Sequence, residues 1–334
     1  MAGTHISITD ALSDAWRRMQ TILFRPFSLE KWLVLGFTAW LAGLGQGGQS
    51  FGWNLGGGAD ANERERWASG AASLAEGDAP GSEFLQANWA SDSRLDWGDR
   101  GRWLLEHPLW VALGAFGCLV LVVLFVVILW LSSRGKFMFL DNVVHDRAEV
   151  VEPWRRFRRL ANSHFFFQLA FFGLFLAAVL ATALLVYTMI SVAGPAWLVV
   201  VPGAVLGVLG VLIIAYIQYF LDGFVVPLMH RHDLAVLDAW RHFGGLLRRH
   251  PGVFLVSGPF LLVLGLAALL AVVMAGLLTC CIGLLLVIIP YVGTVILLPI
   301  PVTYRGFTVA LLDRMEPGYF PDTAVEPAST GSTT

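Results

Sequence analysis

Charged side chains are scarce in this sequence: Asp, Glu, Lys and Arg together make up only 14% of its 334 residues. Soluble globular domains carry about 25% charged residues, so the composition excludes an ordinary water-exposed surface. Hydrophobic residues reach 57% instead. Because a surface so poor in charge suits lipid better than water, we expect an integral membrane protein.

Cysteine is also rare. Cys118 lies inside an apolar run, and Cys280 and Cys281 are adjacent between two further runs. This spacing matches neither a disulfide framework nor a zinc site. We interpret all three as small packing residues, with a vicinal disulfide or a metal site as the weaker alternatives.

Motifs of known enzymes are missing as well: there is no nucleotide-binding loop, no HExxH and no GxSxG. The apolar runs hold almost no ionisable group, and Gln168 and Gln218 are their most polar side chains. Ion-coupled transporters normally have carboxylates or broken helices at the membrane midplane. Carboxylates are lacking here, whereas Pro290, Pro299 and Pro301 leave a broken helix open.

Four histidines raise the question of a metal site near the cytoplasmic surface. They are His145, His230, His232 and His242. We favour interfacial histidines that stay near lipid phosphates, and we predict no metal, no cofactor and no catalytic residue.

Apolar runs of about 20 residues, the length that crosses a bilayer, dominate the chain. A weaker run at 32–50 turns Gly-rich after Leu44 but is flanked by tryptophan, and we count it as a span. The six predicted transmembrane helices are 32–50, 109–131, 165–193, 196–221, 252–278 and 282–304. The fold class is therefore an all-α integral membrane protein with one polytopic domain, 1–316.

Basic residues are distributed unevenly between the two sides of the predicted spans. Seventeen of the 22 lie at the N-terminus, in two connecting segments and after the last span, and five lie in the loop 47–107. Cytoplasmic loops carry the excess of Lys and Arg. We therefore expect both termini in the cytoplasm, an extracytoplasmic loop at 47–107 and a disordered cytoplasmic tail at 317–334.

A short motif occurs three times, each time before an odd-numbered span. It reads acid, small residue or Pro, Trp, Arg, basic residue and bulky apolar residue, beginning at Asp14, Glu152 and Asp238. Trp and the apolar residues share one helical face, whereas the basic residues point elsewhere. Such helices lie in the membrane interface, so we predict interfacial helices at about 7–25, 150–162 and 235–249. The predicted lipid-contacting residues are Trp16, Arg17, Arg18, Trp154, Arg155, Arg156, Trp240 and Arg241.

A second repeat follows the even-numbered spans: a charge, a glycine and an aromatic-led apolar stretch. The charged residues are Arg134, Asp222 and Arg305. Because Asp222 has the opposite sign, we hypothesise that the three form an ion-pair cluster at the cytoplasmic mouth of the bundle. The alternative is that each side chain extends separately to water. The predicted unit, used three times, is an interfacial helix followed by a transmembrane hairpin.

These motifs resemble an uncharacterised bacterial family of six-helix membrane proteins. The resemblance rests on the Asp-Ala-Trp motif, the stretch Phe224–Met229, Cys280-Cys281 through Val295, Arg305, and Pro317 with Tyr319. The architecture is also loosely similar to the membrane domain of some glycerophosphodiester phosphodiesterases, from which no catalytic residue carries over. The resemblance implies the bacterial cytoplasmic (inner) membrane and no particular activity.

The resulting functional prediction is a non-enzymatic accessory or organising protein. We expect it to engage anionic lipid headgroups on the cytoplasmic side and a membrane-protein partner, with no nucleic acid. A transporter or lipid-translocating protein with a central cavity is the alternative. A membrane-embedded enzyme is the third possibility and requires His or acidic side chains that converge in a cleft.

Overall fold

The computed structural model describes residues 7–44, 108–192, 197–279, 283, 286–287 and 289–320. The chain divides into two compact units, 1–52 with 126–334, and 53–125. Of the second unit, only residues 108–125 are described. All regular elements among the described residues are helices. The predicted loop 47–107 and residues 321–334 of the predicted tail lie outside the described residues.

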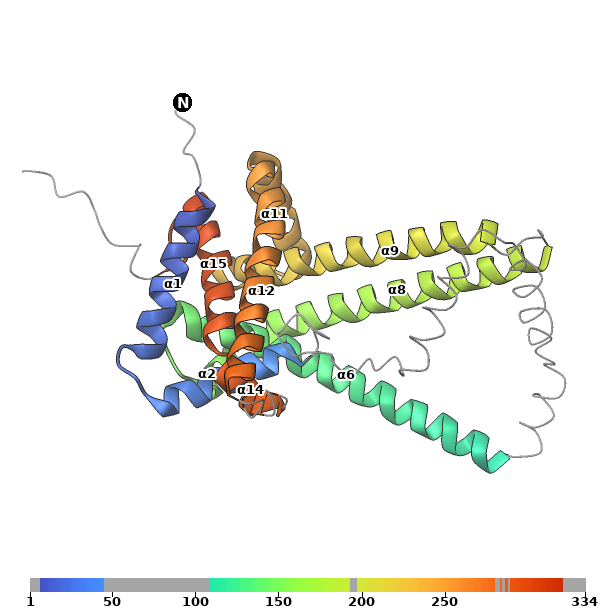
Figure 1. The fold of residues 1–334 in the computed structure, drawn as a ribbon, viewed down its shortest axis with the longest axis horizontal. Coiled ribbons are helices and arrows are strands. Elements are labelled where there is room, and N and C mark those ends of the chain that lie inside the picture. Colours follow the sequence, from blue (N-terminus) through green and yellow to red (C-terminus); the bar gives the residue numbers. More distant parts are fainter. Residues whose placement is uncertain are drawn as a thin grey trace, which may run out of the picture. The chain divides into compact units, whose positions relative to one another are not determined.

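The helices follow one another along the chain and carry the labels of Figure 1. They are α1 (Ile8–Phe24), α2 (Leu29–Gly43), α6 (Pro108–His145), α7 (Val151–Arg156), α8 (Arg158–Val192), α9 (Trp197–Phe220), the π-helical turn η1 (Leu221–Val225), α10 (Val226–His232), α11 (Val236–Arg249), α12 (Pro251–Leu278), α14 (Pro290–Ile296) and α15 (Pro299–Met315).

Four described stretches are long and apolar enough to cross a membrane. They are Pro108–His145, Arg158–Val186, Val205–His232 and Pro251–Leu278. Each contains one of the predicted second to fifth spans or most of it. Their most apolar windows are almost wholly exposed within the chain, at 0–11% buried, as expected of surfaces that face lipid.

The predicted first and sixth spans do not form single long helices among the described residues. Helix α2 has only 15 residues, too few to cross a bilayer alone, and ends before the undescribed residues. The sixth span is broken into α14 and α15, which meet at an angle of 63°. Pro299 begins α15 and lacks an N–H group, so the helix cannot continue through it with regular hydrogen bonds. The described residues thus contain four candidate spans, or five with the bent pair, and six stays a prediction.

The predicted interfacial helices also differ from the structure at one place. Helices α1 and α11 fall within the predicted ranges 7–25 and 235–249. The range 150–162 is instead divided, because α7 ends at Arg156 and α8 begins two residues later. From there α8 runs on into the apolar stretch without a break, since no Gly or Pro separates the two.

The hydrophobic core lies where three helical segments are buried on all sides. Every residue is buried in 132–144, in 220–229 and in 305–312. These segments follow the second, fourth and sixth predicted spans and carry the charge-Gly-aromatic motif. A helix that is buried all round lies in the centre of a protein rather than on its surface.

The helices that carry the tryptophan motif pack against these central segments. Phe157 stacks on Phe137 with ring centroids 6.3 Å apart, and Phe243 stacks on Phe224 at 5.9 Å. Helix α1 lies beside α15, as Figure 1 shows. They come close at Gly306, where an added Cβ would lie 3.4 Å from Ala15 Cβ. Helices near the two ends of the chain therefore pack together.

Gly135 permits another close helix contact. A Cβ atom added there would lie closer than 3.0 Å to backbone atoms of Leu41 and Ala42 in α2. Ser132, one turn earlier, donates a hydrogen bond of 2.8 Å to the Ala42 carbonyl oxygen. Helix α2 thus contacts the backbone of α6 directly, and any larger residue at 135 would push the two helices apart.

The packed part of the chain extends beyond the predicted domain end at 316. Tyr319 and Phe320 are 7% and 3% exposed and belong to the hydrophobic core. The guanidinium of Arg18 lies 3.4 Å above the Phe320 ring. The first described residues of the predicted disordered tail are therefore ordered against α1.

The glycine contact yields a stability prediction. Gly135→Ala adds a methyl group against the rigid backbone of α2, and we expect a loss of about 1–3 kcal/mol. Gly173→Ala is the matched control, because nothing lies within 4 Å of its added Cβ. Thermal unfolding in detergent should show a lower midpoint for the first variant only. Equal midpoints for the two variants would contradict the close α2–α6 contact.

Candidate functional site: buried charges and a histidine-lined cavity

A buried charge cluster lies between the central helical segments. Lys136 Nζ is 2.6 Å from Asp222 Oδ1, and the two side chains are only 1% and 8% exposed. His164 Nε2 lies 3.6 Å from the same carboxylate oxygen. The ion pair joins α6 to η1, at positions 86 residues apart in the chain.

Arg305 of α15 joins this cluster through the backbone. In the π-helical turn η1, the Val226 N–H bonds to Leu221 O, five residues back, instead of Asp222 O. The next residue, Pro227, has no N–H, so the Asp222 carbonyl loses its helical donors. Arg305 donates a short hydrogen bond to this carbonyl oxygen. Lys136, Asp222 and Arg305 thus tie three helices together.

Arg134, the third member of the predicted ion-pair cluster, makes different contacts. Its guanidinium donates to Trp154 O at 3.2 Å and to Asn162 Oδ1 at 3.3 Å. It also lies over the Trp130 and Trp154 rings, 4.6 and 4.8 Å from their centroids. The structure therefore brings Asp222 and Arg305 together and places Lys136, rather than Arg134, opposite the carboxylate. Gly135 separates the two basic residues, so they point in different directions around α6.

The ion pair predicts an asymmetric response to mutation. Lys136→Met leaves the Asp222 carboxylate buried without its lysine and should lower the free energy of unfolding by about 3–5 kcal/mol. Lys136→Met with Asp222→Asn removes both charges and should be less destabilised than Lys136→Met alone. Lys31→Met is the control, since Lys31 pairs at 2.7 Å with an Asp146 side chain that is 50% exposed. A pair of that kind contributes about 0–1 kcal/mol.

Unfolding in detergent, followed by thermal midpoint or denaturant titration, measures these differences. A Lys136→Met protein as stable as the Lys31→Met protein would show that the buried pair does not hold the helices together.

The arginines predicted to contact lipid are mostly exposed, and two of them pair with the acid of their own motif. Arg17 lies 2.8 Å from Asp14, and Arg241 lies 2.9 Å from Asp238. Both arginine side chains remain at least 73% exposed. Arg155 and Arg156 are exposed on α7, whereas Arg18 covers the Phe320 ring.

The three motif tryptophans lie in different environments. Trp16 is 51% exposed and borders a groove of about 420 Å³, whose other lining residues include Phe24 and Arg25. Trp154 and Trp240 are half-buried, and Trp240 packs against the hydrophobic core. The bulky apolar residue of each motif is buried instead, and so is the residue before the tryptophan: Ala15, Pro153 and Ala239. The small size of that residue lets the helix approach the core.

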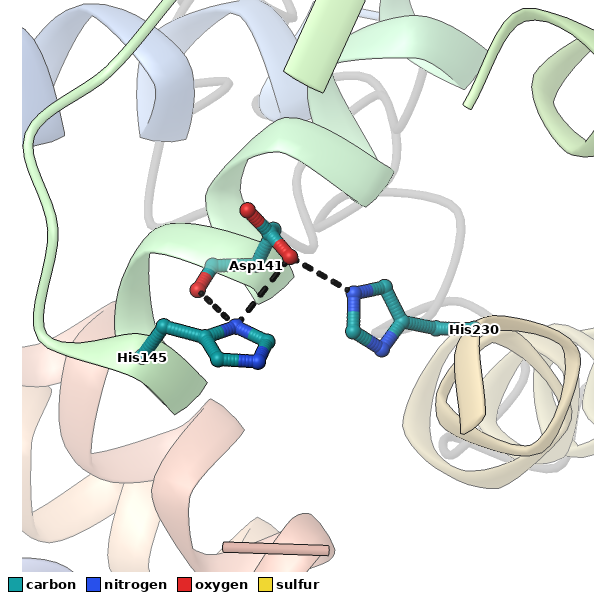
Figure 2. A group of neighbouring side chains, drawn as sticks. All are labelled: Asp141, His145 and His230. Carbon is teal, nitrogen blue, oxygen red and sulfur yellow. Dashed lines mark hydrogen bonds and ion pairs between the residues drawn. The ribbon is translucent and has the colours of Figure 1, made fainter. Parts of the chain in front are cut away.

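A second polar group lies on the other side of α6, where two histidines share one carboxylate. His230 Nε2 is 3.0 Å from Asp141 Oδ1, and His145 Nδ1 is 3.1 Å from the same oxygen. Figure 2 shows Asp141 and His145 one turn apart on α6, with His230 reaching over from α10. Phe157 packs against the His230 ring at 4.7 Å. Sequence analysis missed Asp141, because the contact joins residues 89 positions apart.

A cavity of about 140 Å³ adjoins this histidine–aspartate cluster. Its polar lining residues are His145, Arg156, His230, Arg231 and Tyr319, and its apolar ones are Leu140, Val144, Pro227 and Val309. Burial and the nearby carboxylate of Glu316 raise the pKa of Tyr319, so its hydroxyl stays protonated at neutral pH. That hydroxyl has no hydrogen-bond partner among the described residues.

Another histidine group lies at the end of α10. Glu316 accepts from His242 Nε2 at 3.0 Å and lies 3.6 Å from His232 Nε2. The three side chains are between 27% and 38% exposed. The four histidines that sequence analysis grouped together therefore divide into two pairs, each organised by a different carboxylate.

Comparison with known proteins places the chain in a family without a known activity. No curated protein and no solved structure is significantly similar to it. The model of a family of unknown function, DUF7544, matches residues 6–314, nearly the whole length. The looser resemblance to the phosphodiesterase membrane domain stays a prediction. The chain belongs to the uncharacterised family DUF7544.

Proposed function

We propose that the protein is a non-enzymatic, multi-pass component of the bacterial inner membrane that binds anionic lipids at its cytoplasmic face. The observation that carries this proposal is the exposed corner between α1 and α2. Trp16, Phe24, Phe27 and Leu29 are each 49–62% exposed there. Contiguous exposed apolar side chains of this size mark an interaction surface.

Basic side chains at the same corner favour lipid as its ligand. Arg17 on α1 and Arg25 directly after its last residue are exposed, and they are the sequence neighbours of Trp16 and Phe24. Tryptophan lies at the level of the headgroups, and arginine binds their phosphates. A mixture of exposed aromatic and basic side chains therefore suits an anionic membrane surface better than either water or the bilayer interior.

The arrangement of helices supports a cytoplasmic location for both ends. Because α1 packs on α15, we propose that these two helices lie on one side of the membrane, which implies an even number of crossings between them. Helix α2 also packs on α14, where Tyr291 donates to Leu33 O at 3.0 Å. We propose that these two short helices belong to the first and sixth crossings, and the excess of basic residues assigns the shared side to the cytoplasm.

We also propose that the chain consists of three copies of one unit. In each motif the small residue, the bulky residue and the following aliphatic residue are buried, as in Ala239, Phe243 and Leu246 of α11. In the stacked pairs Phe137–Phe157 and Phe224–Phe243, the bulky residue of a tryptophan motif packs on the first aromatic residue after the glycine of the second repeat. In the first copy, α1 takes the same place against α15. A partner membrane protein would then contact the exposed spans.

Lipid retention tests this function. Each basic residue near an anionic surface contributes about 1 kcal/mol, so Arg17→Gln should weaken retention of phosphatidylglycerol or cardiolipin about fivefold. Trp16→Ala should weaken it further. Native mass spectrometry of the protein, released from detergent micelles at rising collision energy, measures the retained lipids.

Arg159→Gln is the matched control. Its side chain is 73% exposed, like that of Arg17, and each of the two arginines pairs with one carboxylate, Asp233 at 2.5 Å and Asp14 at 2.8 Å. Arg159 lies on α8, outside the α1–α2 corner. Equal loss of anionic lipid from the Arg17→Gln and Arg159→Gln proteins would show that charge alone, and not the α1–α2 corner, retains the lipid.

A transporter with a central cavity is the second candidate. It is favoured by the broken helix α14–α15 and by the charged residue Asp222 on a π-helical turn, a feature that often marks functional sites. The candidate requires a path for water to Gln168 and Gln218, yet Gln168 is 5% exposed.

Cysteine labelling separates the two candidates. In a chain without its three native cysteines, Gln168→Cys and Gln218→Cys should stay unlabelled by a membrane-impermeant maleimide. Leu237→Cys, at a position that is 60% exposed on α11, is the positive control. Labelling of either glutamine position at the rate of the control would favour the transporter.

A further inference from the structure

The cavity beside the histidine–aspartate cluster has the character of an anion site. Arg156 and Arg231 both line it. Among the described residues, neither guanidinium lies within 4.0 Å of a carboxylate, whereas Arg17, Arg159, Arg241 and Arg314 all do. Two guanidinium groups that face one small cavity, neither of them in contact with a carboxylate, attract an anion.

The unpartnered hydroxyl of Tyr319 is independent evidence for a ligand. The side chain is 7% exposed, lines the cavity and has no hydrogen-bond partner among the described residues. A buried hydroxyl without a partner costs about 1–3 kcal/mol. A bound acceptor, such as an anionic oxygen, removes that cost.

The two imidazoles add directed donors. Asp141 holds His145 and His230 through one ring nitrogen each, at 3.1 and 3.0 Å (Figure 2). The second ring nitrogen of each imidazole is then turned away from the carboxylate. An imidazole that carries both ring protons donates one N–H to Asp141 and offers the other to an anion. Asp141 is thus a positioning residue for the two histidines.

We propose that this cavity binds a phosphate group. Arg156 and Arg231 supply charge-assisted hydrogen bonds, and Tyr319, His145 and His230 supply further donors. Arginine with histidine and hydroxyl donors is the combination that phosphate oxygens require. The phosphate is either free inorganic phosphate or the terminal phosphate of a lipid such as phosphatidic acid. This site shares no residue with the α1–α2 corner, so it does not depend on the proposed lipid function.

A divalent metal is the competing ligand, since Asp141, His145 and His230 have ligand atoms within 4.8 Å of one another. Two histidines and one carboxylate are a known zinc set. The adjoining Arg156 and Arg231 repel a cation, however, and no further carboxylate lines the cavity. The electrostatics therefore favour the anion.

Two binding experiments on the full chain in nanodiscs test the proposal. In nanodiscs of phosphatidylcholine, calorimetry with inorganic phosphate detects the free anion. In nanodiscs with added phosphatidic acid, native mass spectrometry detects a retained lipid. Binding in the first experiment identifies free phosphate, and binding in the second alone identifies the lipid headgroup.

Point variants show whether the cavity is the site. Loss of one charge-assisted hydrogen bond should weaken binding about tenfold in Arg156→Gln and in Tyr319→Phe. The phenylalanine variant removes only an unpartnered hydroxyl and should fold normally. Arg155→Gln is the matched control, because Arg155 is the exposed neighbour on α7 and does not line the cavity. It should bind within about twofold of the unmodified protein.

Three results would overturn the proposal. The first is that the protein binds phosphate in neither experiment. The second is binding that Arg156→Gln and Tyr319→Phe leave unchanged. The third is a Zn²⁺ titration that saturates without phosphate and is abolished by His145→Gln, which would make the cluster a metal site. Failure here leaves the lipid-retention result of Arg17→Gln unaffected, so the two proposals fail separately.

Discussion

Asp222 is the residue on which the packing of the central helices depends. Its carboxylate receives Lys136 from α6, and its carbonyl receives Arg305 from α15. A buried charge without a partner is strongly destabilising, so the three segments cannot move apart without exposing or stranding a charge. The π-helical turn contributes to this arrangement, because it and Pro227 leave the carbonyl available for Arg305.

Small residues let the surrounding helices come close enough for these polar contacts. Gly135 brings α6 against the backbone of α2, and Gly306 brings α15 against Ala15 of α1. Small residues also permit close packing at the tryptophan motifs, since the residue before each tryptophan is Ala or Pro and is buried. Charge pairing and close packing therefore occur at one end of the long apolar helices, whereas their most apolar windows are almost wholly exposed.

The polar side chains that could bind a ligand lie at the same end of the long apolar helices. The histidine–aspartate cluster and its cavity lie on α6 and α10, directly beyond the apolar stretches. The α1–α2 corner carries exposed aromatic and basic side chains. This arrangement fits our proposal that the protein meets its ligands at the membrane surface rather than along a path through the bilayer. That arrangement favours binding of lipid headgroups or phosphate over transport.

The sequence by itself predicted an all-helical protein with long apolar helices, the positions of four of those helices and the residues of both short motifs. These features depend on local composition and on spacing within one helix, which a single sequence contains. The family resemblance could be recognised for the same reason, since its motifs are short and contiguous.

Only the tertiary structure decided which charged groups meet. Arg134 and Lys136 both precede α7 and differ by two positions, yet Lys136 reaches Asp222 while Arg134 lies between two tryptophans. The rotation of α6 about its axis, in which Gly135 faces the backbone of α2, decides which of the two basic side chains reaches Asp222. Asp141, His145 and His230 likewise come together across 89 residues. Contacts of such long range depend on how whole helices pack, which no local pattern encodes.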